Sequence, residues 1–132
     1  MNIYEGTARL KKIYKIWEEA TDYRCFYDCA RTDREVFTHR ITTKSLKKGA
    51  YVKEIWLDSP EARQYKQMIK NPAYQVKLLP TNAQLKADIM IFEDKIHLNS
   101  DKDNRSLEVV ELVNKELTDY MITFFDELWN RL

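Results

Sequence analysis

His97 is the side chain with the widest chemical repertoire in this sequence, and it lies in the segment KIHLNSD. An imidazole can attack phosphorus when a nearby cation stabilises the charge that develops on the phosphoryl oxygens. The motif for that chemistry is H-x-K-x4-D, but Asn99 stands where the motif needs its lysine. We therefore expect no catalysis from His97 and place it on a strand, exposed or half-exposed.

Other reactive side chains also lack the neighbours that chemistry requires. Glu108 and Glu111 have the spacing of the solvated side of an amphipathic element, and nothing near them in the sequence would raise a carboxyl pKa. Cys25 and Cys29 could supply two zinc ligands, but the sequence has no second Cys or His cluster to supply the other two. With only two glycines, a glycine-rich phosphate loop is nearly excluded. We expect no catalytic residue, no metal and no cofactor.

Composition indicates one compact domain spanning residues 1–132, because 44% of the residues are hydrophobic and only two are Gly and three Pro. The formal charge of +1 gives no overall attraction to nucleic acid or to an anionic membrane, so nucleic-acid binding would need a local patch. There is no apolar run of 18 residues and no signal-peptide pattern at the N-terminus. We expect a cytoplasmic protein without membrane contact.

The elements that would position these side chains follow from hydrophobic periodicity. Apolar residues at steps of three and four predict a helix over 6–20, and the aromatic run 23–30 predicts a strand. A second helix is expected to begin at Asp33, carry Arg40 on the same side as Lys44, and end before Gly49. These two cations could hold an anion or could simply form a solvated helix face.

The second half of the chain predicts further strands and two helices. Strands are expected over 51–57, 74–78, 87–92, 95–100 and 106–112, with a loop over 100–105. Ser59 with Pro60 should open one helix, and Asn114 should cap a long C-terminal helix. The fold class is α/β: a mixed, twisted sheet of about six strands covered by helices, since strands joined through helices lie parallel and a hairpin adds antiparallel members.

Three segments together resemble the C-terminal effector-sensing domain of TrmB-type transcriptional regulators. They are IYEGTARLKKIY near the start, THRITTKSLKKGAYVKEIWLDSPEARQY in the middle, and the ending from ADIMIFEDKIHLNS to FFDELWNRL. The resemblance implies a phospholipase D-like fold that has lost its catalytic motif. It also implies a non-enzymatic domain that binds a small molecule such as a sugar and dimerises, while DNA is bound only through a separate winged-helix domain that this chain lacks.

The expected effector contacts are Tyr27, Arg40, Glu93 and His97, in a cleft at strand ends. An alternative from a different class is a stand-alone phospholipase D-like interaction or nucleic-acid-binding module. A third is a scaffold that only dimerises through the face of its last helix.

Overall fold

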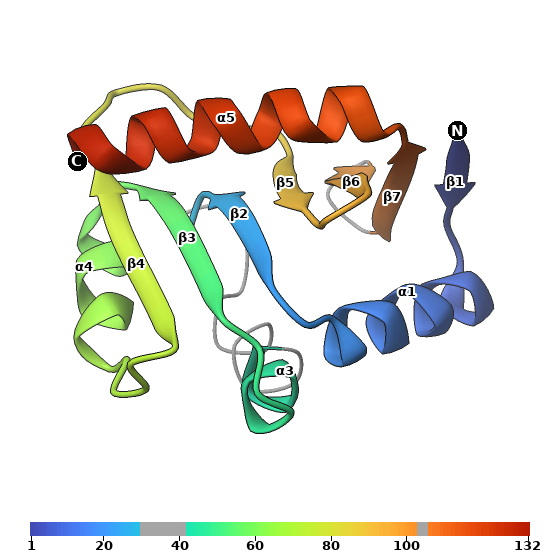
Figure 1. Ribbon diagram of the computed structural model, residues 1–132, viewed down its shortest axis with the longest axis horizontal. Helices are drawn as coiled ribbons and strands as arrows, with labels where there is room; N and C mark the ends of the chain where they lie inside the picture. Colours follow the sequence, from blue (N-terminus) through green and yellow to red (C-terminus); the bar gives the residue numbers. More distant parts are fainter. Residues whose placement is uncertain (30–41, 103–105) are drawn as a thin grey trace.

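Among the residues that the structure describes, 1–29, 42–102 and 106–132, seven strands form one sheet (Figure 1). The structure is a computed structural model. The strand order across the sheet is β1-β7-β6-β5-β2-β3-β4. The strands are β1 (Asn2–Tyr4), β2 (Tyr23–Tyr27), β3 (Val52–Leu57), β4 (Tyr74–Leu79), β5 (Asp88–Ile91), β6 (Lys95–Lys102) and β7 (Ser106–Val113).

The sheet is mixed, as the sequence predicts. Strands β2, β3 and β4 are parallel neighbours, and the pairs β2–β5, β5–β6, β6–β7 and β1–β7 are antiparallel. The helices are α1 (Thr7–Glu19), α3 (Thr43–Lys47), α4 (Pro60–Gln67) and α5 (Lys115–Arg131). The parallel strands β3 and β4 are joined through α4, which is the connection that parallel pairing requires.

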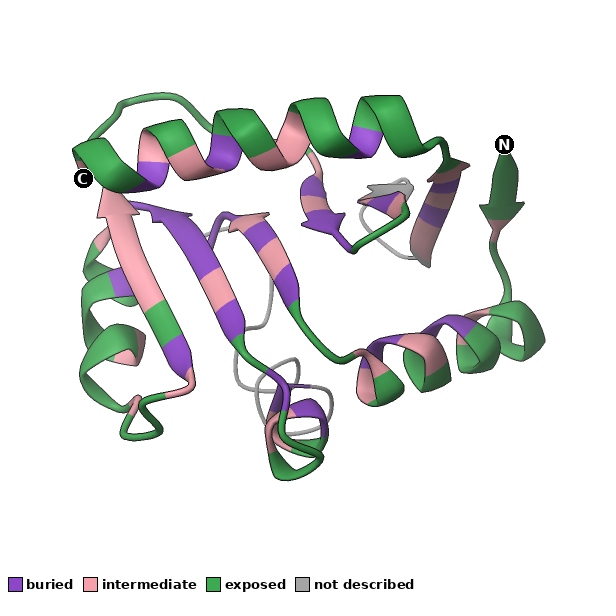
Figure 2. Cartoon of the chain, in the orientation of Figure 1, coloured by how far each residue is buried: buried purple, intermediate pink, exposed green. Residues whose placement is uncertain are grey.

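The helices divide between the two faces of the sheet. Residues of α1, α3 and α4 pack with β2, β3, β5 and β7 in one core, which contains Ile13, Trp17, Trp56 and Ala62. The long helix α5 covers the opposite face, where Phe125 and the sheet residues form a second core. Figure 2 shows this division along α5, whose buried positions lie toward the strands and whose exposed positions lie away from them.

Helix α5 is fixed at its start, along its length and at its end. The Asn114 side chain accepts a hydrogen bond of 2.8 Å from the Leu117 amide, which is the cap that the sequence predicts. Arg24 of β2 forms an ion pair of 2.8 Å with Asp126. At the C-terminus the Lys77 ammonium donates to the Trp129 carbonyl at 2.9 Å and lies over the Trp129 ring.

Several predicted boundaries are wrong. The loop expected over 100–105 does not begin at residue 100, because β6 continues to Lys102 through backbone pairing of Asp101 with Leu107 and of Lys102 with Ser106. Backbone pairing does not depend on side-chain polarity, so a polar sequence did not end the strand. Helix α4 ends at Gln67 rather than near residue 70, since its last turn tightens into i→i−3 hydrogen bonds.

Two further expectations concern the first third of the chain. Strand β1 was not predicted: it has three residues, and only its pairing with β7 makes it a strand. Most of the helix expected from Asp33, including Arg40, lies outside the described residues. Its end agrees with the prediction, because α3 stops at Lys47 and Gly49 adopts a positive φ of 91°.

Candidate functional site

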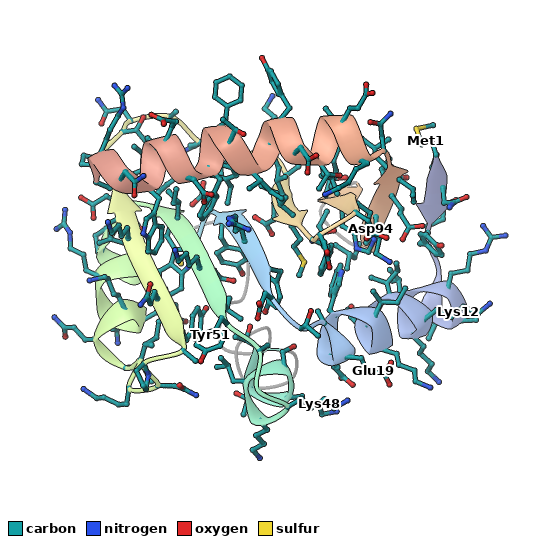
Figure 3. All side chains as sticks on the ribbon, in the orientation of Figure 1. Met1, Lys12, Glu19, Lys48, Tyr51 and Asp94 are labelled. Atoms are coloured by element: carbon teal, nitrogen blue, oxygen red, sulfur yellow. The ribbon has the colours of Figure 1, made fainter. Side chains whose placement is uncertain are left out.

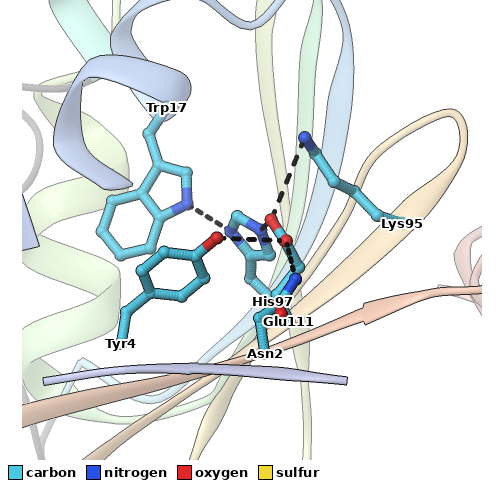
Figure 4. A network of polar contacts seen from close by, with 6 residues as sticks. All are labelled: Asn2, Tyr4, Trp17, Lys95, His97 and Glu111. Carbon is cyan, nitrogen blue, oxygen red and sulfur yellow. Dashed lines mark hydrogen bonds and ion pairs between the residues drawn. The ribbon is translucent and has the colours of Figure 1, made fainter. Parts of the chain in front are cut away.

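A buried polar network is centred on His97 of β6, beneath helix α1 (Figure 4). The Trp17 indole Nε1–H donates to His97 Nδ1 at 2.7 Å, and His97 Nε2 lies 2.8 Å from Glu111 Oε2. His97 and Glu111 are paired residues of β6 and β7, so the ladder itself brings their side chains together. The network joins α1 to the centre of the antiparallel half of the sheet.

Glu111 receives three further partners from the edge of the sheet. Asn2 Nδ2 donates to Glu111 Oε1 at 3.1 Å, and the Tyr4 hydroxyl lies 3.4 Å from the same oxygen. Lys95 Nζ lies 4.0 Å from Glu111 Oε2. Both carboxylate oxygens are therefore engaged, and strand β1 is held to the network by side chains as well as by its backbone.

The tautomer of His97 follows from its neighbours. An indole nitrogen can only donate, so His97 Nδ1 must accept and Nε2 must carry the proton that is donated to Glu111. Burial lowers the pKa of His97 from its ordinary value, against the opposing effect of the hydrogen bond to Glu111. Burial raises the pKa of Glu111, but hydrogen bonds from His97 and Asn2 outweigh it, and the net direction is down. The stable arrangement is a neutral imidazole beside a carboxylate.

This geometry corrects two expectations from the sequence. His97 is 0% exposed rather than exposed or half-exposed, because Trp17 of α1 covers it. Glu111 is buried rather than on a solvated side, because it lies two residues from the core residue Val109 and so shares the inner face of β7 with it. Both ring nitrogens of His97 are occupied, so in this arrangement the imidazole holds elements together and presents no nucleophile.

A second polar group lies on the same sheet face, toward the carboxyl ends of the parallel strands. Asp88 and Asn99 are direct partners in the β5–β6 ladder. Tyr27 follows the pair Phe26–Ile89, so it lies on β2 beside Asp88. All three side chains are buried. We call Tyr27, Asp88 and Asn99 the edge cluster. The carboxyl edge of parallel strands is where α/β sheets bind ligands.

Asn99 is the unusual member of the edge cluster. Its side chain is 3% exposed, yet neither its amide nitrogen nor its amide oxygen has a hydrogen-bond partner among the residues that the structure describes. A buried amide offers two donors and an acceptor, and leaving it unsatisfied costs about 1–3 kcal/mol. A polar molecule bound at this position would supply both missing partners.

A third buried polar group lies farther along the sheet, on β3. Glu54 is fully buried, and its Oε1 accepts hydrogen bonds from the Trp56 indole at 2.9 Å and from the Tyr74 hydroxyl at 2.5 Å. These two hydrogen bonds tie Glu54 to strands β3 and β4. The same core face therefore holds polar side chains from five adjacent strands, β7, β6, β5, β2 and β3.

The structure places the predicted site residues apart from one another. Tyr27 lies in the edge cluster, and His97 lies on the same face, two residues from Asn99 along β6. Glu93 is exposed in the β5–β6 turn, at the opposite end of β5 from Asp88, so it joins neither group. Arg40 lies outside the described residues. No single set of contacts brings Glu93 together with Tyr27 and His97.

Sequence reasoning missed Asp88, Asn99, Trp17 and Glu111 as members of polar groups. The available signal was strand alternation: Asn99 and His97 are two residues apart, so they must share a face, and that face was the buried one. In the part of the chain that the structure describes, no group of three or more His, Cys, Asp or Glu side chains could hold a metal ion. None of the described helices has the length and apolarity needed to cross a membrane.

Comparison with known proteins gives a likeness in fold. No family model matches the sequence, and no curated protein matches it. Among solved structures the chain is similar to TrmBL2, an archaeal chromatin protein whose structure shows a novel mode of DNA binding. The TM-score is 0.60 at 11% sequence identity, and the match covers 98% of this chain and 52% of TrmBL2. The chain thus has the fold of about half of TrmBL2.

Proposed function

We propose that this chain is an effector-sensing and dimerisation domain of a TrmB-like transcriptional regulator, acting in the cytoplasm without catalysis. The observation that supports this most is the fold likeness to TrmBL2 over 98% of the chain, which agrees with the resemblance in sequence. The match to 52% of TrmBL2 is the extent expected of one part of a longer regulator. DNA binding by that regulator would belong to a separate winged-helix domain.

The effector would bind at the edge cluster, with Asn99 as its main contact. The unsatisfied amide favours a neutral polar molecule that can both accept and donate hydrogen bonds, such as a sugar. Asn99 is already enclosed, so binding requires the packing on this face to change. That requirement suits a sensor, because a ligand shifts a conformational equilibrium only when it prefers one of the two states.

The proposed absence of catalysis is supported by the chemistry of His97. A nucleophilic imidazole needs a free nitrogen within reach of the substrate, whereas His97 is buried and donates to Glu111 while accepting from Trp17. The lysine that would stabilise a phosphorane is replaced by Asn99. Turnover of a phosphodiester by purified protein, abolished by His97→Gln, would contradict this part of the proposal.

Dimerisation would use the outer face of α5. Three large apolar side chains on that face are exposed at steps of three and four residues: Leu117, Tyr120 and Phe124. Tyr120 and Phe124 pack edge to face with ring centroids 4.6 Å apart, which holds them as one surface. An exposed apolar stripe on a helix with a polar rim is typical of an interface.

A thermal-unfolding screen tests the sensing proposal. Sugars, nucleotides and small metabolites are added singly to the full chain, and a compound at a hundred times its Kd should add about 2.7 kcal/mol to the free energy of unfolding. The same compound should leave Asn99→Leu unchanged, while Asn130→Leu, an exposed position on α5, should respond like the native chain. A compound that stabilises Asn99→Leu equally would remove the edge cluster as the site.

A further inference from the structure

Helices α1 and α3 together present a dense set of exposed cations. We call this surface the basic face. Its members are Arg9, Lys11, Lys12, Lys15, Lys44, Lys47 and Lys48. All seven side chains are exposed, and none belongs to the polar network or to the edge cluster. The two helices come from segments more than twenty residues apart in the chain, so the sequence does not reveal this surface as one unit.

Direct contacts join the two helices. The buried Ser45 hydroxyl of α3 donates to the Trp17 carbonyl of α1 at 2.7 Å, and the Lys44 ammonium lies 3.1 Å from Glu18. Figure 3 shows both helices along one side of the molecule, with labels at Lys12 of α1 and at Lys48, the residue directly after α3. These contacts place the end of α1 beside the start of α3, so the cations of the basic face lie on two neighbouring helical segments.

The charge on this surface differs from that of the chain as a whole. The two helical segments 7–19 and 43–48 contain seven basic residues and two acidic ones, a net charge of +5, whereas the whole chain has +1. Lys44 pairs with Glu18, but the other six cations form no ion pair with any residue in the described ranges. Clustered like charges repel one another, so an anionic partner would relieve a cost that the free protein carries.

We propose that the basic face binds the phosphate backbone of duplex nucleic acid without sequence preference. Six of its seven cations are lysines, whose ammonium groups act as point charges toward phosphate. Helix α1 is about 20 Å long at 1.5 Å per residue, and B-DNA carries one phosphate per about 1.7 Å of axis, so several contacts can form at once. This goes beyond the sensing function, which assigns DNA binding to a separate domain.

The residue types on the basic face favour duplex nucleic acid over a membrane or a protein as its partner. Among the described residues of α1 and α3, Tyr14 is the one exposed large apolar side chain, at 37%, whereas insertion into a membrane surface needs a broad apolar face. A protein interface needs buried aromatic or Arg anchors in pockets, which a lysine-covered helix does not supply. Six of the seven side chains are lysines, which contact phosphates as point charges, and phosphate contacts carry no sequence information, so the expected binding is sequence-independent.

Fluorescence anisotropy with a labelled duplex of random sequence tests this proposal. The full native chain should bind in the range of non-specific contacts, with Kd of about 10⁻⁴–10⁻⁶ M, and log K should fall with log salt at a slope of about −3 to −5. The triple variant Lys11→Gln, Lys12→Gln, Lys15→Gln should bind about tenfold or more weakly at low salt, with a slope less steep by about 2 to 3.

A matched variant controls for total charge. Lys66→Gln, Lys70→Gln, Lys86→Gln removes three exposed lysines that lie outside α1 and α3, and it should bind the duplex like the native chain. Equal loss in both triple variants, or no binding by the native chain at low salt, would overturn the proposal. Tighter binding to anionic vesicles or to poly-glutamate than to the duplex would overturn it as well. None of these results depends on whether an effector binds at the edge cluster.

Discussion

The protonation state of His97 is set by Trp17, which donates to Nδ1, and by Glu111, which accepts from Nε2. Trp17 can only donate a hydrogen bond, so protonation of His97 Nδ1 would break that contact and place a charge in the core. The charged groups that face the ring are Glu111 and Lys95, and the polar ones are Trp17 and, through Glu111, Asn2 and Tyr4. The neutral imidazole therefore belongs to the folded state.

The lowered pKa of His97 predicts a loss of stability in weak acid. The unfolded chain takes up the proton near the ordinary pKa of 6.5 and the folded chain does not, so the free energy of unfolding falls as pH drops below that value. The slope is at most about 1.4 kcal/mol per pH unit for one proton. Urea unfolding at pH 7.5 and pH 5.5 measures it.

His97→Gln is the control for this pH dependence. Glutamine can accept from Trp17 and donate to Glu111 but does not titrate, so the variant should lose less stability between pH 7.5 and pH 5.5 than the native chain. An identical loss in both proteins would show that another group is responsible. Glu111, whose pKa is also lowered, contributes in a separate window below its ordinary value of 4.5.

Replacing Asn99 with an apolar residue is expected to stabilise the protein. Asn99→Leu replaces an unsatisfied buried amide with an apolar side chain of similar size, so the free energy of unfolding should rise by about 1–2 kcal/mol. The measurement is chemical denaturation in the absence of added ligand. Asn130→Leu, on the exposed side of α5, should change stability by less than about 0.5 kcal/mol. A clear destabilisation by Asn99→Leu would mean that the amide has partners in the folded protein.

At individual positions the sequence predicted the place of a residue in a strand better than the burial of its side chain. Tyr27 was predicted to lie at a strand end, and it is the last residue of β2. His97 and Glu111 were assigned to solvent because polar side chains are usually exposed. Their burial depends on α1 returning over the sheet, with Trp17 contacting a residue 80 positions later. Local patterns contain no information about such a contact.

The contacts of Lys77 at the C-terminal end of α5 predict how much this end of the helix contributes to stability. Lys77 Nζ contacts the Trp129 and Leu132 carbonyls and lies 4.8 Å from the Trp129 ring centroid. Lys53 Nζ lies 5.5 Å from the same ring centroid and makes no hydrogen bond to a carbonyl of α5. Lys77→Met should therefore cost about 1–2 kcal/mol of stability through the lost helix-end and cation–π contacts.

Lys53→Met is the matched comparison on the neighbouring strand. It should cost less than Lys77→Met in the same denaturation experiment, because no helix carbonyl loses a partner. A larger cost for Lys53→Met would show that the ring contact, and not the cap of α5, holds the end of the helix.

The helix ends could be predicted where residues close in the sequence determine them. Ser59 with Pro60 begins α4, Asn114 caps α5, and Gly49 follows α3, each for a reason visible within four residues. Strand β1 and the end of β6 could not be predicted, since their pairing with β7 alone defines them. Helices could be located by their own caps, whereas edge strands depend on a partner distant in sequence.

The outer face of α5 predicts self-association of the protein. Replacing Leu117, Tyr120 and Phe124 with serine should convert a dimer to a monomer in sedimentation equilibrium, since these side chains supply the exposed apolar surface of the helix. Tyr51→Ser with Met68→Ser removes comparably exposed side chains elsewhere and should leave the dimer intact. A native chain that stays monomeric at high micromolar concentration would contradict this assignment.

The sequence predicted the α/β class, the mixed sheet and the covering helices, because alternation of strand and helix patterns restricts the topology. It did not predict the basic face. The overall charge of +1 averages a strongly basic pair of helices with an acidic remainder, and only the packing of α3 against α1 brings the cations together. The net charge of the chain therefore does not reveal the local charge of this surface.

The most direct test of effector binding at the edge cluster is an NMR measurement of the Asn99 side-chain amide. Its resonances are assigned by comparison with Asn99→Leu and followed while a stabilising compound is added to the native chain. Binding at the edge cluster predicts that both amide protons shift and exchange more slowly, as they gain acceptors. Unchanged Asn99 resonances at saturating compound, with shifts confined to other parts of the chain, would contradict it.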